Sequence, residues 1–393
     1  MGYDFDRVIE RRGSNSAKWD AMETLYGVDP QDGLAMWVAD ADFATAPVVT
    51  AAMRAMADHG VYGYTASDAA YREAVCWWMR TRHGWEVAPE AVFTTNGLCN
   101  AVALVLDAMT APGDEIILMA PVYHAFAKTI RNAGRVVAER PLVQDEAGLY
   151  RMDLPAWEAA MTGRERAVIL CSPHNPGGRV WTAEEQRALA EFAARHDLLV
   201  ISDEIHQDLT FPGATHVPFL LAAPDAAPRT AVLNAPSKTF NTAGMHCGQV
   251  ILPDPALRGR FAARMQALAM APSSVGQEAT RAAYSPEGAA WVDALRDYLD
   301  GNRRLFDAGV NAIPGLRSMP LEATYLAWVD FSGTGMETAE ILDRVQGRAR
   351  IAGNLGASFG TGGESFLRFN LATQRARIEE AVARLQAAFA DLQ

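Results

Sequence analysis

Residues 231–241 read AVLNAPSKTFN, an apolar run followed by a single lysine, Lys238, between two hydroxyl residues. A lysine after a strand is a weak signal by itself. It gains weight because two other segments stand upstream, SPHNPGG at residues 172–178 and SDEIH at residues 202–206, each also after an apolar run. Ligands of open α/β sheets collect outside the carboxyl ends of the strands. We therefore expect the three segments to meet in one crevice.

These segments carry groups that suit one cofactor, pyridoxal phosphate (PLP), whose chemistry the protein directs. Lys238 supplies an amine for a Schiff base, and enclosure beside the cationic cofactor lowers the pKa of such a lysine. Asp203 supplies a carboxylate that keeps the pyridine nitrogen protonated, and Asn175 supplies an amide for the phenolic oxygen O3′. Each position taken alone is equally typical of a residue without a catalytic role: Lys238 of a surface lysine, and Asp203 and Asn175 of turn residues. As a set they predict a PLP enzyme in which Lys238 is catalytic.

The phosphate and the ring of the cofactor need further groups. Gly97 and Leu98 follow Asn96 at the start of an expected helix, and a helix N-terminus offers free N–H groups to a phosphate. Ser237 adds a hydroxyl at the same end of the cofactor. Tyr123, in the segment PVYH, is expected to stack on the pyridine ring and to be catalytic together with Lys238, with ordinary packing as its alternative.

Arg368 stands in the apolar segment FLRFN at residues 366–370. An unpaired guanidinium in such a strand is costly, so this side chain needs an anionic partner. Bidentate capture of a substrate carboxylate meets that need, and an internal salt bridge is the alternative. The segment YGYT at residues 62–65 has no role that its residues alone indicate.

The composition is that of an ordinary globular enzyme and limits its partners. The chain has 393 residues, of which 50% are hydrophobic, and its net charge of −12 argues against nucleic acid or an anionic membrane surface. No apolar run approaches the ~20 residues that span a bilayer, and the polar, acidic N-terminus lacks a secretory signal. The eight histidines show no paired spacing for a metal. The cysteines are scattered and are expected to be free, buried thiols in a cytoplasmic protein: Cys76, Cys99, Cys171 and Cys247.

From about residue 90, strand and helix patterns alternate, which predicts an α/β fold with a mostly parallel, doubly wound sheet. Beyond about residue 285 the pattern changes to a smaller α+β unit. We expect three parts: residues 1–50 as an N-terminal arm and part of the small domain, 51–285 as the large PLP-binding domain, and 286–393 as the small domain. The expected strands lie at 92–95, 115–119, 135–138, 167–171, 198–202, 230–233, 249–252, 325–330 and 366–371, and the main helices at 98–109, 183–195, 286–308, 337–346 and 375–392.

Over nearly its whole length the chain resembles fold type I PLP enzymes of the class I/II aminotransferase superfamily. Within that superfamily it is most similar to the MalY/PatB-like branch of β C–S lyases, usually called cystathionine β-lyases. The resemblance rests on the segments MWVADADF (36–43), YGYT (62–65), PVYH (121–124), NPGG (175–178), SDEIHQDL (202–209), SKTFN (237–241), GASFG (356–360) and GESFLRFNLA (363–372).

The resemblance implies further roles for residues of the site. It implies a homodimer in which Tyr64 reaches the cofactor phosphate of the neighbouring subunit. It also implies that Arg368 binds the α-carboxylate of an amino-acid substrate, helped by the backbone near Ala39. His206 stands where most aminotransferases place a tyrosine that bonds O3′, and His246 where they place a phosphate-binding arginine. Both departures resemble the lyase branch.

The same residues serve two fates of an amino acid, so the reaction stays open between them. The resemblance favours β-elimination from cystathionine, cysteine or related S-substituted L-cysteines, with thiol, pyruvate and ammonia as products. The alternative is a class I/II aminotransferase. A PLP-fold regulatory protein is a third reading, but such regulators carry an additional DNA-binding domain, and here the pattern begins before residue 40. Trp37, Tyr123 and the loop around Asn354 are candidates to contact the sulfur substituent.

Overall fold

The computed structural model describes residues 2–392. Its larger sheet contains the strands β2 (Val92–Thr95), β3 (Glu115–Ala120), β4 (Val136–Gln144), β5 (Tyr150–Met152), β6 (Glu165–Cys171), β7 (Leu199–Asp203), β8 (Thr230–Asn234) and β9 (Gly248–Ile251). Their order across the sheet is β2-β9-β8-β7-β6-β3-β4-β5. The pairs β8–β7, β7–β6, β6–β3 and β3–β4 are parallel, whereas β2–β9, β8–β9 and β4–β5 are antiparallel. The predicted α/β fold with a mostly parallel sheet is confirmed.

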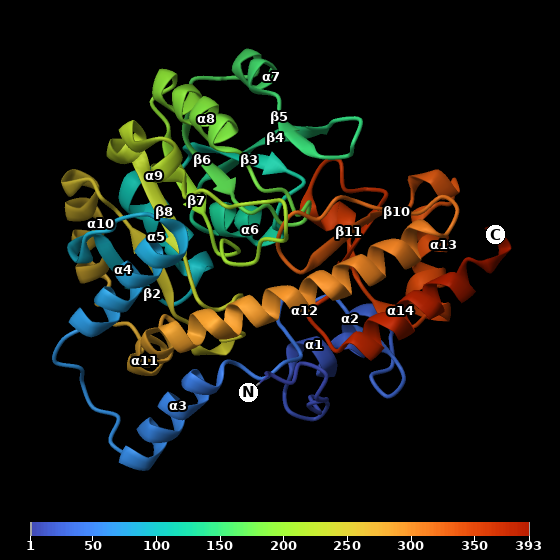
Figure 1. The fold of residues 1–393 in the computed structure, drawn as a ribbon. Coiled ribbons are helices and arrows are strands. Elements are labelled where there is room, and N and C mark those ends of the chain that lie inside the picture. The colour runs from blue at the N-terminus through green and yellow to red at the C-terminus, as the bar shows by residue number, and fades with distance from the viewer. Residues whose placement is uncertain (1, 393) are drawn as a thin grey trace.

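Helices cover both faces of this sheet (Figure 1). Successive side chains of a strand point to opposite faces; accordingly Val200 of β7 lies in one hydrophobic core, while Leu199 and Ile201 lie in the other. One core is closed by α5 (Leu98–Met109), α6 (His124–Asn132) and α10 (Pro255–Ala267). The other is closed mainly by α4 (Ala69–His83), α8 (Ala183–Arg195), α9 (Phe219–Ala222) and α11 (Ser274–Ala283).

A second, antiparallel sheet lies at the C-terminal side of the molecule. It contains β10 (Arg317–Ser318), β11 (Leu326–Asp330), β14 (Phe366–Asn370) and β13 (Asn354–Leu355), in that order. The long helix α12 (Pro286–Asn311) runs from α11 to this sheet, where it packs against α14 (Arg375–Ala388) (Figure 1). The helix expected at 337–346 is instead a short α13 (Thr338–Leu342) continued by a π-helical turn over Asp343–Arg348.

The N-terminal residues pack on the small sheet and reach the large one. Two short helices, α1 (Ala17–Asp20) and α2 (Met22–Tyr26), precede β1 (Leu34–Ala35), which pairs with β12 (Ile351–Ala352). The following stretch, residues 36–43, then crosses to the large sheet, where the amide of Asn241 donates to the carbonyls of Ala41 and Phe43. This stretch therefore joins the two sheets. The domain boundaries expected from the sequence stay a prediction.

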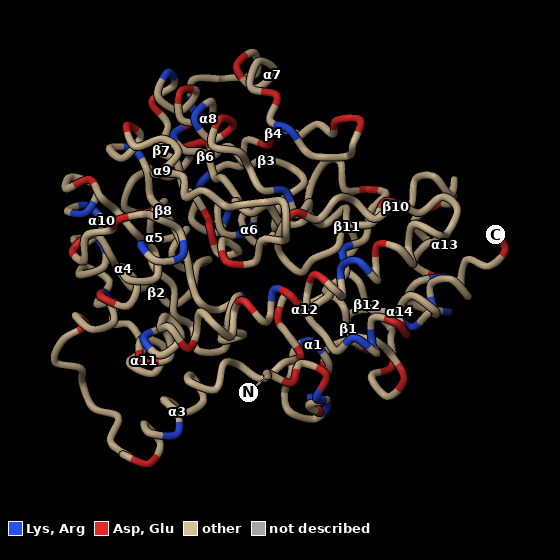
Figure 2. Tube along the Cα trace, viewed as in Figure 1, with Lys and Arg blue, Asp and Glu red and all other residues tan. Residues whose placement is uncertain are grey.

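Two further features of residues 2–392 are the hydropathy of the helices and the distribution of charged residues. Among residues 2–392, no helix is both long and apolar enough to cross a bilayer. Basic and acidic residues are interspersed along the described trace, mainly on helices and loops (Figure 2).

Candidate active site

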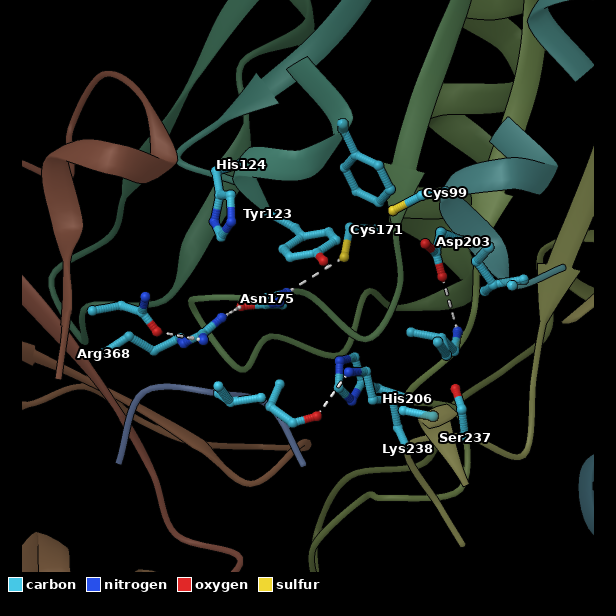
Figure 3. Close-up of a pocket in the computed structure, with 18 of the residues that line it drawn as sticks. Cys99, Tyr123, His124, Cys171, Asn175, Asp203, His206, Ser237, Lys238 and Arg368 are labelled. Carbon is cyan, nitrogen blue, oxygen red and sulfur yellow. Dashed lines mark hydrogen bonds between the residues drawn. The ribbon is translucent and has the colours of Figure 1, made fainter. Parts of the chain in front are cut away.

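A cavity of about 720 Å³ opens at the carboxyl ends of β6, β7 and β8, beside the small sheet. Figure 3 shows the side chains that converge on it from both sheets. Nearly all the residues expected from the sequence line it: Ala39, Gly97, Leu98, Tyr123, Asn175, Asp203, His206, Ser237, Lys238 and Arg368. Tyr64 does not; it is fully exposed in the segment between α3 (Pro47–His59) and α4.

Lys238 projects into the cavity from the turn that follows β8. Its Nζ donates a hydrogen bond to the carbonyl of Ala39 at 2.7 Å. Burial and the charge of Arg368 lower the pKa of the ammonium to about 8, so a useful fraction is a neutral nucleophile near neutral pH. The sequence has only two other lysines: Lys18 is buried in an ion pair with Asp42 at 3.0 Å, and Lys128 is exposed on α6.

Asp203 ends β7 and is buried at the back of the cavity. Its carboxylate accepts the backbone N–H of Ile205 at 3.0 Å and forms no ion pair with another described residue. Burial, together with the charge of Glu204, raises the pKa of Asp203 to about 7. A buried carboxylate without a counter-charge is costly. The protonated ring nitrogen of PLP would supply that charge.

Arg368 lies at the centre of β14 and is held by neutral oxygens. Its Nη1 donates to Asn175 Oδ1 at 2.9 Å, and its Nη2 donates to Trp37 O and Asn354 Oδ1, both at 2.7 Å. No carboxylate pairs with it among residues 2–392, so the internal salt bridge considered above is absent there. Its Nε is buried without a hydrogen-bond partner in the same range. The full positive charge is thus available to an incoming anion.

The opposite end of the cavity suits a phosphate. Gly97, with φ of 89°, directs the chain into the 12-residue helix α5, whose first residues, Leu98 and Cys99, line the cavity together with Ser237. A helix N-terminus offers free N–H groups to a phosphate. His246 lines the same cavity in a left-handed conformation, with φ of 47°. These donors, the lone carboxylate of Asp203 and the amine of Lys238 fit PLP.

Two aromatic side chains complete the walls. Burial raises the pKa of Tyr123 to about 12, and its ring meets that of His124 edge-on at 5.0 Å. His206 is buried, and its Nδ1 has no hydrogen-bond partner within residues 2–392. Burial and the charges of Lys238 and Arg368 lower the pKa of His206 far below its usual value, so its ring is neutral. A neutral ring nitrogen is able to bond O3′ of the cofactor.

The structure corrects one expectation and adds residues that the sequence did not single out. Cys99 was expected to be a buried thiol, but it is exposed to the cavity, because it lies in the first turn of α5. The other three cysteines are buried and free, as expected. Tyr26 also lines the cavity, and its hydroxyl accepts a hydrogen bond from Asn354 at 3.0 Å. No sequence signal marked Tyr26, whose ring packs against that of Trp37 with centroids 5.1 Å apart.

Comparison with known proteins gives the chain its family. The model of the family "Aminotransferase class I and II" matches residues 37–385. Cystathionine beta-lyase PatB of Bacillus subtilis is 37% identical over 98% of this chain and 99% of its own. Cystalysin of Treponema denticola, whose structure contains pyridoxal 5′-phosphate, has a TM-score of 0.94 and 33% identity over the full length of both chains. A PLP-bound putative aminotransferase of Clostridium difficile has the same TM-score of 0.94 and 33% identity, over 99% of this chain and 100% of its own. The chain belongs to the aminotransferase class I and II family.

Proposed function

We propose that the protein is a PLP-dependent C–S lyase. Its substrates are cystathionine, cysteine or related S-substituted L-cysteines, and its products are a thiol, pyruvate and ammonia. The observation that carries this proposal is the end-to-end similarity to a cystathionine β-lyase, at 37% identity, in a chain whose cavity gathers Lys238, Asp203, Asn175 and Arg368.

Each end of the cofactor has its own partners in this proposal. Lys238 attaches the cofactor, and Asp203 keeps the ring nitrogen protonated. Asn175 and His206 bond the phenolic oxygen. The amides of Gly97 and Leu98, with the hydroxyl of Ser237, hold the phosphate. When bound, PLP supplies the electron sink that stabilises a carbanion at the substrate's Cα.

The protein's own residues orient the substrate and move its protons. Arg368 binds the α-carboxylate in bidentate fashion, helped by the backbone near Ala39. The amine of Lys238, released from the cofactor, removes the Cα proton. The Cβ–S bond then breaks and both its electrons leave with the sulfur, which takes up a proton. The phenol of Tyr123 stays protonated at neutral pH and offers a hydrogen bond to the departing sulfur. Water converts the remaining three-carbon fragment to pyruvate and ammonia.

An aminotransferase is the second candidate, because a solved structure described as a putative aminotransferase matches this chain as well as cystalysin does. The residues named above serve both reactions. The two differ in whether a leaving group departs from Cβ or the amino group stays behind for a keto acid.

We also propose that the protein works as a homodimer in the cytoplasm, with Tyr64 completing the site of the neighbouring subunit. The complete exposure of Tyr64 supports this, together with the way α3 and the segment after it extend from the body of one chain (Figure 1). An exposed tyrosine far from its own cavity is well placed to serve another.

Product analysis tests the reaction. The protein, loaded with PLP, is incubated with L-cystathionine with and without a keto acid. The proposal predicts equal amounts of thiol and pyruvate, independent of the keto acid. Amino-group transfer to the keto acid without release of thiol would move the protein to the aminotransferases.

A further inference from the structure

A buried cluster of titratable side chains lies behind the cavity, and the proposed chemistry does not use it. It comprises two carboxylates and two imidazoles, which are Asp208, Glu204, His83 and His216. At most 6% of any of these four side chains is exposed. Buried charges of this kind are expensive unless each is paired and hydrogen-bonded, so the arrangement needs a reason.

Asp208 is the centre of this cluster and accepts three hydrogen bonds. Its Oδ1 accepts from the indole of Trp78 at 3.0 Å and lies 2.8 Å from His83 Nε2. Its Oδ2 accepts from the hydroxyl of Thr239 at 2.8 Å. Thr239 is itself completely buried and directly follows Lys238. The carboxylate therefore fixes the turn that carries the lysine.

The same carboxylate belongs to the loop that carries Asp203. Asp208 stands five positions after Asp203, in the segment that follows β7. Glu204 anchors the start of that segment: it accepts from Ser202 Oγ at 2.8 Å and from Phe219 N at 2.9 Å, and lies 3.1 Å from His216 Nε2. The His216 ring in turn meets that of His83 edge-on, with centroids 5.9 Å apart. One continuous cluster thus backs both cofactor-binding groups.

We propose that Asp208, supported by His83, is a positioning residue that holds the Lys238 turn in register with Asp203. This inference rests on the proposed attachment of PLP at Lys238. The lysine and the carboxylate come from neighbouring strands, and the hydrogen bond from Thr239 to Asp208 is the side-chain link between their two turns. Catalytic groups displaced by about 1 Å can lose a hundredfold in rate. Loss of the link therefore lowers turnover without touching the substrate contacts of Arg368.

Three variants isolate this link. Asp208→Asn removes the charge of the carboxylate, Thr239→Val removes the hydroxyl, and Thr239→Ser keeps the hydroxyl. The matched control is Glu165→Gln, which changes an equally buried carboxylate, paired with Arg140 at 2.7 Å. Glu165 lies at the amino end of β6, whereas Lys238 follows the carboxyl end of β8.

The first readouts use the PLP-loaded proteins. For Asp208→Asn and Thr239→Val we expect kcat to fall by about tenfold to a hundredfold while KM changes little. The visible circular dichroism of the bound cofactor, per molecule bound, should change as well, because it reports how the cofactor sits. Thr239→Ser and Glu165→Gln should match the wild type in all three. Unchanged kcat and dichroism in Thr239→Val would overturn the proposal, even if Asp208→Asn fails to fold.

The second readout does not need the cofactor. In cofactor-free protein, we expect backbone hydrogen exchange over residues 236–241 to be faster in Thr239→Val than in the wild type or Glu165→Gln. Equal exchange rates would overturn the inference. If the wild type binds no PLP, the proposed function fails, and this measurement alone decides whether Asp208 anchors the turn.

Discussion

At the scale of single residues, burial in the cavity brings the pKa values of Lys238 and Asp203 close to neutral pH. Burial lowers the pKa of Lys238 to about 8, and burial raises that of Asp203 to about 7. The amine attacks only when neutral, and the carboxylate attracts a protonated ring nitrogen only when ionised. Both fractions grow as the pH rises through these values.

Capture of PLP by the cofactor-free protein should therefore depend on pH in a defined direction. We expect the rate to rise between about pH 6 and pH 9 and to level off above, because nearly all of the amine is then neutral. Stopped-flow absorbance after mixing with PLP measures this rate. A rate that keeps rising to about pH 10 would mean that Lys238 titrates like an exposed lysine.

Arg368 is the residue on which substrate binding should depend most. Replacing it by methionine removes the charge-assisted contact with the carboxylate, which contributes a net of roughly 1.5–3 kcal/mol. We expect KM for an S-substituted cysteine to rise about 10–100-fold, with a smaller change in kcat. The matched control is the α-carboxamide of the same substrate, whose turnover the substitution should leave unchanged. Equal losses for acid and amide would contradict a carboxylate contact.

At the scale of elements, the sequence was informative wherever a motif directly follows a strand. The runs before residues 175, 203 and 238 were identified as strands, and parallel pairing then places their carboxyl ends at one edge. The direction of β9 was not predictable, since apolar periodicity carries no information about strand direction. The change from α13 to a π-helical turn after Leu342 was not predicted either. The partners of Arg368 were also missed. They come from three distant segments, around Trp37, Asn175 and Asn354, that only the fold assembles.

The turn into α5 offers a test at this scale. Gly97 has φ of 89° and ψ of 168°, a conformation essentially restricted to glycine. Gly97→Ala should cost about 1–3 kcal/mol of stability and weaken PLP binding, because the amides of the first turn move. Gly213→Ala is the matched control: its φ is +95°, and a Cβ there meets nothing within 4 Å.

Both glycine variants should be destabilised to a similar degree in a thermal or denaturant melt. Only Gly97→Ala should show a higher Kd for PLP in an equilibrium titration, by about tenfold. A parallel loss of cofactor affinity in Gly213→Ala would show that the effect is general strain rather than a disturbed phosphate site.

At the scale of the whole molecule, the cavity is completed by the N-terminal stretch that joins the two sheets. Lys238 donates to Ala39 of this stretch, which a buried ionic cluster around Asp42 holds in place. Burial raises the pKa of Asp42, but the charge of Lys18 and the hydrogen bonds from Trp19 and Lys18 outweigh it and lower the pKa to about 2. The sequence motif at residues 36–43 indicated the resemblance, but not this contact, because a pairing across 199 residues has no local signature.

The proposed dimer can be tested by complementation. Tyr64→Ala and Lys238→Ala should each be nearly inactive, because each removes a group from every site. A mixed dimer of the two has one site with both groups intact, so co-refolded equal mixtures should recover about a quarter of wild-type activity. Analytical ultracentrifugation of the wild type supplies the assembly state. No recovery in demonstrably mixed dimers would contradict a contribution of Tyr64 across the interface.

Chemical trapping of the cofactor decides whether Lys238 is its point of attachment. The protein, loaded with PLP, is reduced with borohydride, digested and mapped by mass spectrometry. The sequence contains only three lysines, so the assignment is unambiguous. We expect the added mass to lie on Lys238 alone and to be absent from Asp203→Ala at limiting PLP. Attachment to Lys18 or Lys128, or no attachment at saturating PLP, would contradict it.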